Sequence, residues 1–231
     1  MVSVITCTIR DYYMENVFEN YDNQLWDEKE LIIILNKDDM DIKKWKNRAK
    51  HSQNVSVFQL PEQATPGECQ NFAVYKAKYH IIAKFDDDDY YSPYYLKGQI
   101  QAMNQTGAHI VGKRDCFYYM EGKRKLMITS FKKNSQNTNV DKVTDSSLMF
   151  RKEVFNTVQF SSDEVNYDSV FQRECVKKGF KIYSTDRYNY TVIRRADVNS
   201  HTWQISDREI KRFTEEVGKI EDYKSFVTKP L

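Results

Sequence analysis

The stretch from Ile81 to Leu96, IIAKFDDDDYYSPYYL, constrains the fold of this chain more than any other. A short apolar run leads into four consecutive aspartates, Asp86 to Asp89, and Ser92-Pro93 then offers a helix N-cap and a first helical residue. Four adjacent carboxylates repel one another, and at the end of a buried strand this is unfavourable unless a cation neutralises them. Such oxygen ligands suit Mg²⁺ and Mn²⁺, and Mg²⁺ commonly shares its shell with substrate phosphates. The stretch therefore predicts a site for a metal-bound diphosphate, with a solvated acidic loop as the alternative.

The composition is that of a globular protein. Of the 231 residues, 40% are hydrophobic and 29% are charged, which argues against disorder and allows a substantial core. The net charge of +2 gives no reason to expect nucleic acid or a membrane surface as a partner. The four cysteines include no CxxC pair, so neither a zinc site nor a disulfide framework is indicated. We see no signal peptide and no apolar run near the ~20 residues of a membrane span, and we expect a cytoplasmic protein.

The first half of the chain alternates apolar strands with short helices. Strands are expected over 2–8, 30–36, 55–60 and 80–86, and helices over about 12–25, 42–49 and 67–78. Strands that are apolar on both faces indicate a mostly parallel, Rossmann-like sheet flanked by helices, whose ligands collect beyond the carboxyl ends of the strands. This rule places Thr8, Arg10, Asn36 and the acidic cluster on one rim. The chain contains neither GxGxxG nor a P-loop, so neither phosphate-binding fingerprint applies.

The second half changes character and predicts a mixed sheet. Strands are expected over 109–114, 116–121, 124–131, 147–150, 181–184 and 188–194, a polar loop over 132–139, and a helix over 168–178. Gly179 should end that helix. A capping box from Ser206 to Glu209 predicts a last helix with Ile210, Phe213, Val217 and Ile220 on one stripe. We interpret the chain as one α/β domain: a nucleotide-binding half (about 1–105), an acceptor half (about 106–205), and a C-terminal helix and tail (206–231).

Several motifs occur together in a recognisable order. They are Val2–Thr8 as first strand, Phe85–Asp89 with Pro93 and Leu96, Gly67 with Gln70-Asn71, Tyr167-Asp168, the run Lys178–Ile182, and Thr185–Tyr190 with Arg194-Arg195 and His201-Thr202-Trp203. Their order and spacing resemble a family 2 glycosyltransferase of the GT-A fold over about residues 1–205. Within that family they look like bacterial enzymes from envelope, capsule or spore-coat clusters.

The resemblance implies an inverting, metal-dependent transfer of a sugar from a nucleoside diphosphate, expected to be UDP, to a hydroxyl of a glycan or other acceptor. It implies Asp168 as the catalytic base and Asp88 as the main ligand of Mn²⁺ or Mg²⁺, with Asp86 and His201 as further ligands. Together with the rim of the sheet, it assigns donor contacts to Thr8, Arg10, Asn36, Asn71, Asp86, Asp87 and Arg194. Such an enzyme would work in the cytoplasm or peripherally at a membrane or spore surface.

Two alternatives remain open. A nucleotidyltransferase that activates sugar phosphates would open with a glycine-rich basic loop after the first strand, and residues 8–11 contain no glycine. A degenerate domain that binds nucleotide or glycan without catalysis is the second alternative. It is suggested by Asn36, Gln70 and Tyr167, where the family usually has an acid, an arginine and a glutamate.

Overall fold

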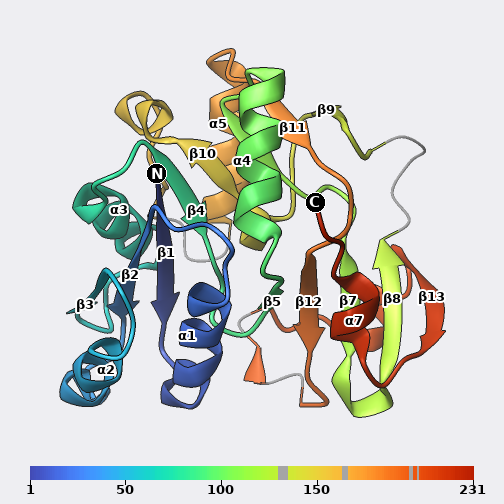
Figure 1. The fold of residues 1–231 in the computed structure, drawn as a ribbon, viewed down its shortest axis with the longest axis horizontal. Coiled ribbons are helices and arrows are strands. Elements are labelled where there is room, and N and C mark those ends of the chain that lie inside the picture. The colour runs from blue at the N-terminus through green and yellow to red at the C-terminus, as the bar shows by residue number, and fades with distance from the viewer. Residues whose placement is uncertain (130–134, 163–165, 198–199, 202) are drawn as a thin grey trace.

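Two mixed β-sheets organise the part of the chain that this computed structural model describes, which is residues 1–129, 135–162, 166–197, 200–201 and 203–231 (Figure 1). Within these residues, an eight-stranded sheet has the order β3-β2-β1-β4-β10-β6-β11-β9. A five-stranded sheet has the order β13-β8-β7-β12-β5. The smaller sheet lies beside the carboxyl ends of the first strands (Figure 1).

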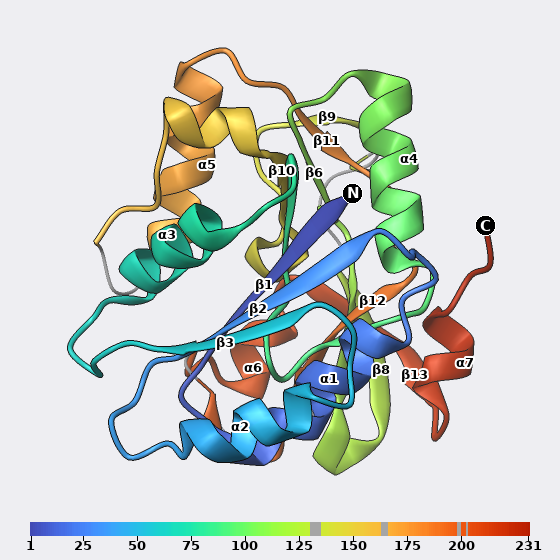
Figure 2. The ribbon, with the colours of Figure 1, turned by 60° about the vertical axis from the view of Figure 1, so that its left-hand side comes forward.

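The first half of the large sheet is parallel and covered by helices on both faces (Figure 2). Its strands are β1 (Val2–Thr8), β2 (Lys29–Leu35), β3 (Val55–Gln59) and β4 (Ile81–Lys84). Its helices are α1 (Met14–Asp22), α2 (Ile42–Ala49), α3 (Pro66–Lys76) and α4 (Tyr95–Thr106), preceded by a 3-10 turn, η1 (Asp11–Tyr13). Alternate residues of β1 and β2 enter two separate cores, one shared with α1, α2 and α4 and the other with α3. The predicted doubly covered parallel sheet is confirmed here.

The second half of the large sheet is mixed, as predicted. Its strands are β6 (Ile110–Gly112), β9 (Thr138–Val140), β10 (Met149–Arg151) and β11 (Ile182–Ser184). β10 is antiparallel to both β4 and β6, whereas β11 is parallel to β6. Helix α5 (Tyr167–Lys177) covers this half, and Gly179 follows it with φ +83°, as expected of a glycine that ends a helix. Short 3-10 turns flank β10: η3 (Asp145–Ser147) precedes it and η4 (Lys152–Asn156) follows it. A further turn, η2 (Glu121–Lys123), lies between two strands of the smaller sheet.

The smaller sheet attaches the acidic cluster to the C-terminal part of the chain. Its strands are β5 (Tyr90–Tyr91), β7 (Phe117–Met120), β8 (Lys125–Thr129), β12 (Tyr190–Arg194) and β13 (Thr214–Lys219). β5 directly follows the four aspartates and pairs with β12. The residues after β12 are thereby brought beside the acidic cluster.

Three sequence predictions were wrong in detail. The capping box at Ser206 forms, but helix α6 (Asp207–Ile210) is a single turn, and β13 follows it and pairs with β8. This pairing satisfies backbone groups of β8 that the predicted long helix would have left at an open edge. The last two residues of the predicted loop, 138 and 139, belong to strand β9 instead. Helix α4 begins at Tyr95, two residues after the predicted start at Pro93.

The remaining boundaries agree with the predictions within a few residues. Residues 130–134, which fall in a predicted strand and a predicted loop, lie outside the described part of the chain. A last helix, α7 (Tyr223–Val227), precedes the C-terminal residues. Within the described residues, no helix has the length and apolar character needed to cross a membrane.

Candidate active site

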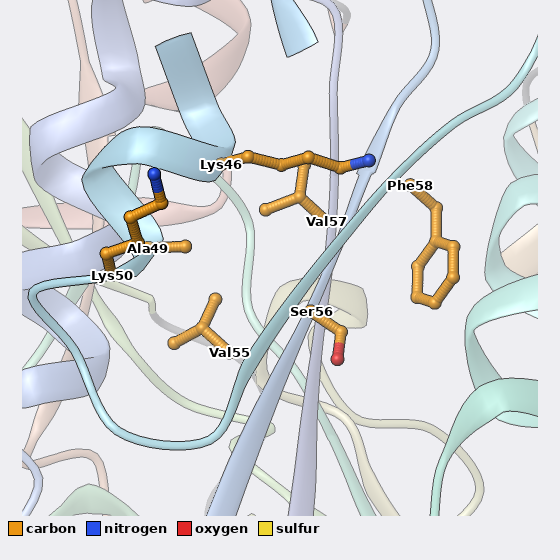
Figure 3. Close-up of a pocket in the computed structure, with 7 residues that line it drawn as sticks. All are labelled: Lys46, Ala49, Lys50, Val55, Ser56, Val57 and Phe58. Carbon is orange, nitrogen blue, oxygen red and sulfur yellow. The ribbon is translucent and has the colours of Figure 1, made fainter. Parts of the chain in front are cut away.

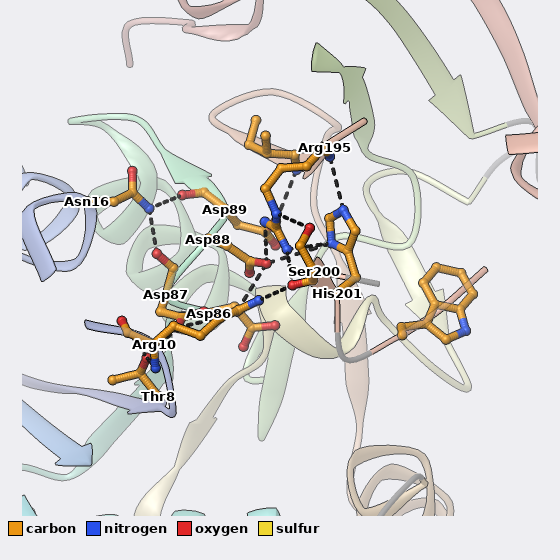
Figure 4. Close-up of polar contacts among 12 residues, drawn as sticks. Thr8, Arg10, Asn16, Asp86, Asp87, Asp88, Asp89, Arg195, Ser200 and His201 are labelled. Carbon is orange, nitrogen blue, oxygen red and sulfur yellow. Dashed lines mark hydrogen bonds and ion pairs between the residues drawn. The ribbon is translucent and has the colours of Figure 1, made fainter. Parts of the chain in front are cut away.

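The four aspartates form a loop between β4 and β5 whose backbone is fixed by helix α1. The side-chain amide of Asn16 donates to the carbonyl oxygens of Asp87 (2.7 Å) and Asp89 (3.1 Å). The amide of Asn20 donates to the Asp89 carbonyl oxygen (2.9 Å) and accepts from the backbone N–H of Tyr91 (3.0 Å). The carboxylates consequently turn toward different partners instead of gathering at one point (Figure 4).

Asp87 is buried and belongs to a network with the end of β1. Its carboxylate accepts hydrogen bonds from the hydroxyl of Thr8 and from Nε (3.1 Å) and Nη2 of Arg10. Arg10 also donates to the carbonyl oxygen of Ser200 (3.0 Å), which ties β1 to the segment after β12. Burial, followed by repulsion from Asp88, raises the pKa of Asp87, and the contacts with Arg10 oppose that rise. Thr8 and Arg10, both predicted to contact the donor, thus meet Asp87 at the rim of the sheet.

Asp89 faces the smaller sheet and is buried. Its carboxylate accepts from the hydroxyl of Tyr190 (2.6 Å) and from the backbone N–H of Ile193 (3.1 Å), both on β12. Burial is the main reason that the pKa of Asp89 is raised well above its ordinary value. This aspartate therefore joins the acidic loop to β12.

Asp88 faces a cluster of basic side chains (Figure 4). Its Oδ2 atom lies 2.8 Å from Nη1 of Arg195, 3.1 Å from Nη2 of Arg10 and 3.9 Å from Nδ1 of His201. Burial, followed by Arg194 and Arg195, lowers the pKa of His201 to about 4. The imidazole is therefore neutral at neutral pH, which is the form that binds metals.

The donor atoms at this place suit a divalent ion in kind. Two carboxylates, Asp86 and Asp88, and the neutral imidazole of His201 are ligands that Mn²⁺ accepts, and carboxylates also suit Mg²⁺. Among the described residues, however, no three His, Cys, Asp or Glu side chains are grouped for metal binding. Instead Arg195 contacts Asp88, and the Lys84 ammonium contacts Asp86 at 2.8 Å. Arg195 contacts Asp88 through Oδ2, so an ion at this oxygen would compete with Arg195.

Asp168, the predicted base, lies in the first turn of α5 and is buried. Its Oδ2 atom is 3.3 Å from the ammonium of Lys84, and Oδ1 is buried without a hydrogen-bond partner among the described residues. Burial raises the pKa of Asp168 to about 7; Lys84 opposes this rise, whereas Asp145 and Asp86 add to it. A carboxyl group with a pKa near neutrality and an unpaired oxygen has the properties of a general base.

Three other predicted donor contacts are engaged with the protein backbone. Asn36 donates to the carbonyl oxygen of Pro61 (2.8 Å). Asn71 donates to the carbonyl oxygen of Phe160 (2.9 Å) and accepts from its N–H (3.0 Å). Arg194 donates to the carbonyl oxygens of Trp203 (3.2 Å) and Ile205 (2.9 Å). The structure thus brings Asp88 and His201 together with Arg10, whereas Asp86 contacts Lys84. Neither Asn36 nor Asn71 has a contact with these residues in the described part of the chain. Their contacts with a donor stay predictions.

Sequence reasoning did not assign Lys84 or Asp145 to the site. Lys84 is the last residue of an apolar strand and is buried, and its ammonium contacts both Asp86 and Asp168. A lysine inside the run IIAKF is a signal that could have found it, because buried lysines need an anionic partner. Asp145 lies in η3, and nothing near it in the sequence indicates that it acts on Asp168.

A separate pocket of about 370 Å³ lies between α2 and the edge strand β3 (Figure 3). Its lining consists of Lys46, Ala49, Lys50, Val55, Ser56, Val57 and Phe58. None of the predicted site residues contributes to it. The candidate active site is therefore the rim around the acidic cluster and Asp168.

Solved structures with the same arrangement of strands and helices define the fold as GT-A. S. aureus TarS 1–349 gives a TM-score of 0.64 at 16% identity, covering 83% of this chain and 60% of that chain. Its complex with UDP-GlcNAc gives 0.62 at 17% identity, over 85% and 59% of the two chains. The mannosyltransferase PcManGT from Pyrobaculum calidifontis, in complex with GDP-Man and Mn²⁺, gives 0.63 at 14% identity, over 87% and 58%. The predicted fold class is confirmed.

The sequence itself identifies the family. Residues 3–159 match the model of glycosyl transferase family 2, and the chain belongs to this family, as the resemblance predicted. The O-antigen biosynthesis glycosyltransferase WbnJ of Escherichia coli is 36% identical over 115 residues, which are 48% of this chain and 45% of that protein. The chain thus matches about half the length of this relative and about 60% of the similar structures.

Proposed function

We propose that the protein is an inverting, metal-dependent glycosyltransferase that moves a sugar from a UDP-sugar to a hydroxyl of a glycan, in the biosynthesis of a surface polysaccharide. The observation that carries the proposal is the position of Asp168. Its carboxylate and that of Asp86 in the acidic cluster both contact the ammonium of Lys84, and its Oδ1 has no hydrogen-bond partner among the described residues. Membership of family 2, the O-antigen glycosyltransferase among the relatives and the UDP-GlcNAc complex among the similar structures support it. We propose the cytoplasm as the place of the reaction.

The donor would lie along the rim that contains the aspartates. Asp88, together with Asp86 and His201, would hold Mn²⁺ or Mg²⁺. When bound there, the ion supplies Lewis-acid stabilisation of the departing diphosphate. Arg195 and Arg10 would remain beside the diphosphate, where charge-assisted hydrogen bonds to phosphate oxygens could replace their contacts with Asp88. Thr8, Asn36, Asn71, Asp87 and Arg194 are proposed as further donor contacts or as supports of them.

The acceptor would approach from the side of α5. Its hydroxyl oxygen forms a bond to the anomeric carbon on the face opposite the diphosphate, and the bond from that carbon to the diphosphate oxygen breaks. The transition state resembles an oxocarbenium ion, and the hydroxyl proton passes to Asp168 Oδ1, which has no hydrogen-bond partner in the described part of the chain. Positioned bases of this kind typically contribute about 10²–10⁴-fold to the rate.

Release of UDP tests the proposal. The protein is incubated with UDP-GlcNAc, UDP-glucose and UDP-galactose, each with and without Mn²⁺, and released UDP is measured beside a thermal-shift assay. We expect Mn²⁺-dependent release from at least one donor and its loss in Asp168→Asn. Stabilisation by nucleotide without release from any donor would instead identify a non-catalytic binding domain. If the Asp168→Asn variant released UDP at the wild-type rate, Asp168 would not be the catalytic base.

A further inference from the structure

Lys84 occupies a position where a charged side chain is unfavourable unless it is paired. It ends β4, which lies between β1 and β10 inside the large sheet, and its backbone N–H donates to the carbonyl oxygen of Leu148 (2.9 Å). Only 3% of its side chain is exposed. A buried ammonium must be compensated by anions and hydrogen bonds. The sheet fixes the backbone of Lys84, and contacts with carboxylates hold its ammonium.

Two carboxylates compensate this ammonium from opposite sides of the site. Nζ of Lys84 lies 2.8 Å from Oδ1 of Asp86 in the acidic loop and 3.3 Å from Oδ2 of Asp168 on α5. Asp86 belongs to the donor side of the proposed site, and Asp168 belongs to the acceptor side. In the proposed site, the lysine therefore links a residue of the donor side to the base on the acceptor side.

The two oxygens of Asp168 are in different situations because of this contact. Lys84 contacts Oδ2, while Oδ1 has no hydrogen-bond partner among the described residues. A proton from the acceptor can therefore be taken by Oδ1 while Oδ2 stays fixed. When Asp168 becomes neutral, Lys84 still has the carboxylate of Asp86, so its charge is not left unpaired in the interior.

We infer that Lys84 is a positioning residue for sugar transfer, which fixes Asp168 relative to the donor site and favours its ionised form before the proton is transferred. This inference rests on the proposed function and adds a role for a residue of β4. An opposite charge within about 4–6 Å typically lowers the pKa of a carboxyl group by about 1–3 pH units. The direction agrees with the effect of Lys84 on Asp168 in this structure.

The test compares Lys84→Met with Lys113→Met. Lys113 is a matched control, because its side chain is also buried, follows a strand of the same sheet, and contacts one carboxylate, Asp186, at 3.4 Å. The pH dependence of kcat is measured with the active UDP-sugar, and UDP affinity is measured by calorimetry. We expect Lys84→Met to move the acid limb of kcat upward by about 1–3 pH units. Lys113→Met should leave the limb in place, and Lys84→Arg should restore it at least in part.

Other groups also influence the pKa of Asp168, so a further measurement must show that the acid limb of the kcat profile reports Asp168. The titratable and charged groups that face it are Lys84, Asp145, Asp86, Tyr167 and Cys7. The free energy of unfolding, measured as a function of pH, gives a test that does not depend on activity. The quantity compared is the difference in this free energy between the single variant Lys84→Met and the double variant Lys84→Met/Asp168→Asn. If Lys84 favours the ionised form of Asp168, the pKa of Asp168 is higher in folded Lys84→Met than in the folded wild type. The difference between the two Lys84→Met variants should then continue to change up to a higher pH than the difference between wild type and Asp168→Asn.

The outcomes separate the two proposals. If wild type releases no UDP from any donor, the proposed function fails, and the unfolding measurement still decides whether Lys84 acts on Asp168. An acid limb and an unfolding difference that both stay at their wild-type pH in folded Lys84→Met would overturn the inference. If Lys84→Met does not fold, the same two measurements on Lys84→Gln decide, because this variant removes the charge and keeps a hydrogen-bond donor.

Discussion

Replacement of Asp168 by asparagine should lower turnover and also remove a pH-dependent penalty on folding. Only 9% of the Asp168 side chain is exposed, and burial raises its pKa from the ordinary 3.8 to about 7. The folded protein therefore binds this proton more tightly than the unfolded chain does. Between these two pKa values the unfolded chain carries fewer protons, so the stability of the wild type falls as pH rises from about 4 to about 7.

The magnitude follows from the two pKa values. One pH unit between them corresponds to about 1.4 kcal/mol, so the interval from 3.8 to about 7 amounts to about 4 kcal/mol. Asparagine cannot ionise and carries no such penalty. Loss of the contact with Lys84 shifts the unfolding free energy of the variant at every pH. The change of this free energy with pH, in contrast, reports the titration of the Asp168 carboxyl group. The difference in unfolding free energy should change in favour of Asp168→Asn by about 1.4 kcal/mol per pH unit from about pH 5 to pH 6.5.

Urea unfolding at a series of pH values between 4.5 and 8.5, without donor or metal, measures this difference. Asp186→Asn is a control of opposite sign: burial would raise the pKa of Asp186, but Lys113 and Lys229 lower it overall. That substitution should therefore lose stability at neutral pH relative to wild type. Parallel curves for Asp168→Asn and wild type between pH 5 and pH 7 would show that Asp168 titrates normally. Asp168 would then not be a base poised near neutrality.

Three further substitutions test the site and its supports. Asp88→Ala should abolish Mn²⁺-dependent binding of UDP in calorimetry, and undiminished affinity would exclude Asp88 as a metal ligand. Gly67→Ala would place a Cβ atom 1.8 Å from the carbonyl oxygen of Ser161. The clash should lower the unfolding free energy by about 1–3 kcal/mol or more, and an unchanged urea midpoint would contradict this contact. Asn20→Ala leaves the buried N–H of Tyr91 without its side-chain acceptor and should cost about 1–3 kcal/mol, measured by the same unfolding assay; a loss below about 0.5 kcal/mol would contradict it.

The parallel half of the sheet could be predicted because its strands carry their own signal. β1 and β2 are rich in β-branched residues and buried on both faces, and this pattern fits a strand between two layers of helices. The end of α5 could also be predicted from nearby residues, because Gly179 adopts a positive φ that other residues rarely take. The position of the acidic cluster at the rim followed from the direction of β4.

The partners of the individual aspartates could not be predicted from the sequence. Consecutive loop residues point in different directions, and their partners come from distant segments: Arg10 follows β1, Tyr190 belongs to β12, and Arg195 follows β12. The helix expected after Ser206 failed for a similar reason. Its apolar spacing fitted a helix, but the open edge of β8 requires a partner strand, and this requirement is visible only in the assembled sheet.

The crowded carboxylates do not by themselves demand a metal, because cationic side chains of the same chain contact them. Lys84 contacts Asp86, Arg10 contacts Asp87 and Asp88, and Arg195 contacts Asp88, so the chain itself supplies cations to the cluster. An ion at Oδ2 of Asp88 would compete with a guanidinium, and a displaced guanidinium would need another anion. The diphosphate of a donor is such an anion, because guanidinium groups pair well with phosphate oxygens. Ion and donor would therefore strengthen each other's binding, and by linkage the two effects must be equal in size. If the proposed ion and donor bind here, the arginines around Asp88 would favour a metal-bound nucleotide over free metal.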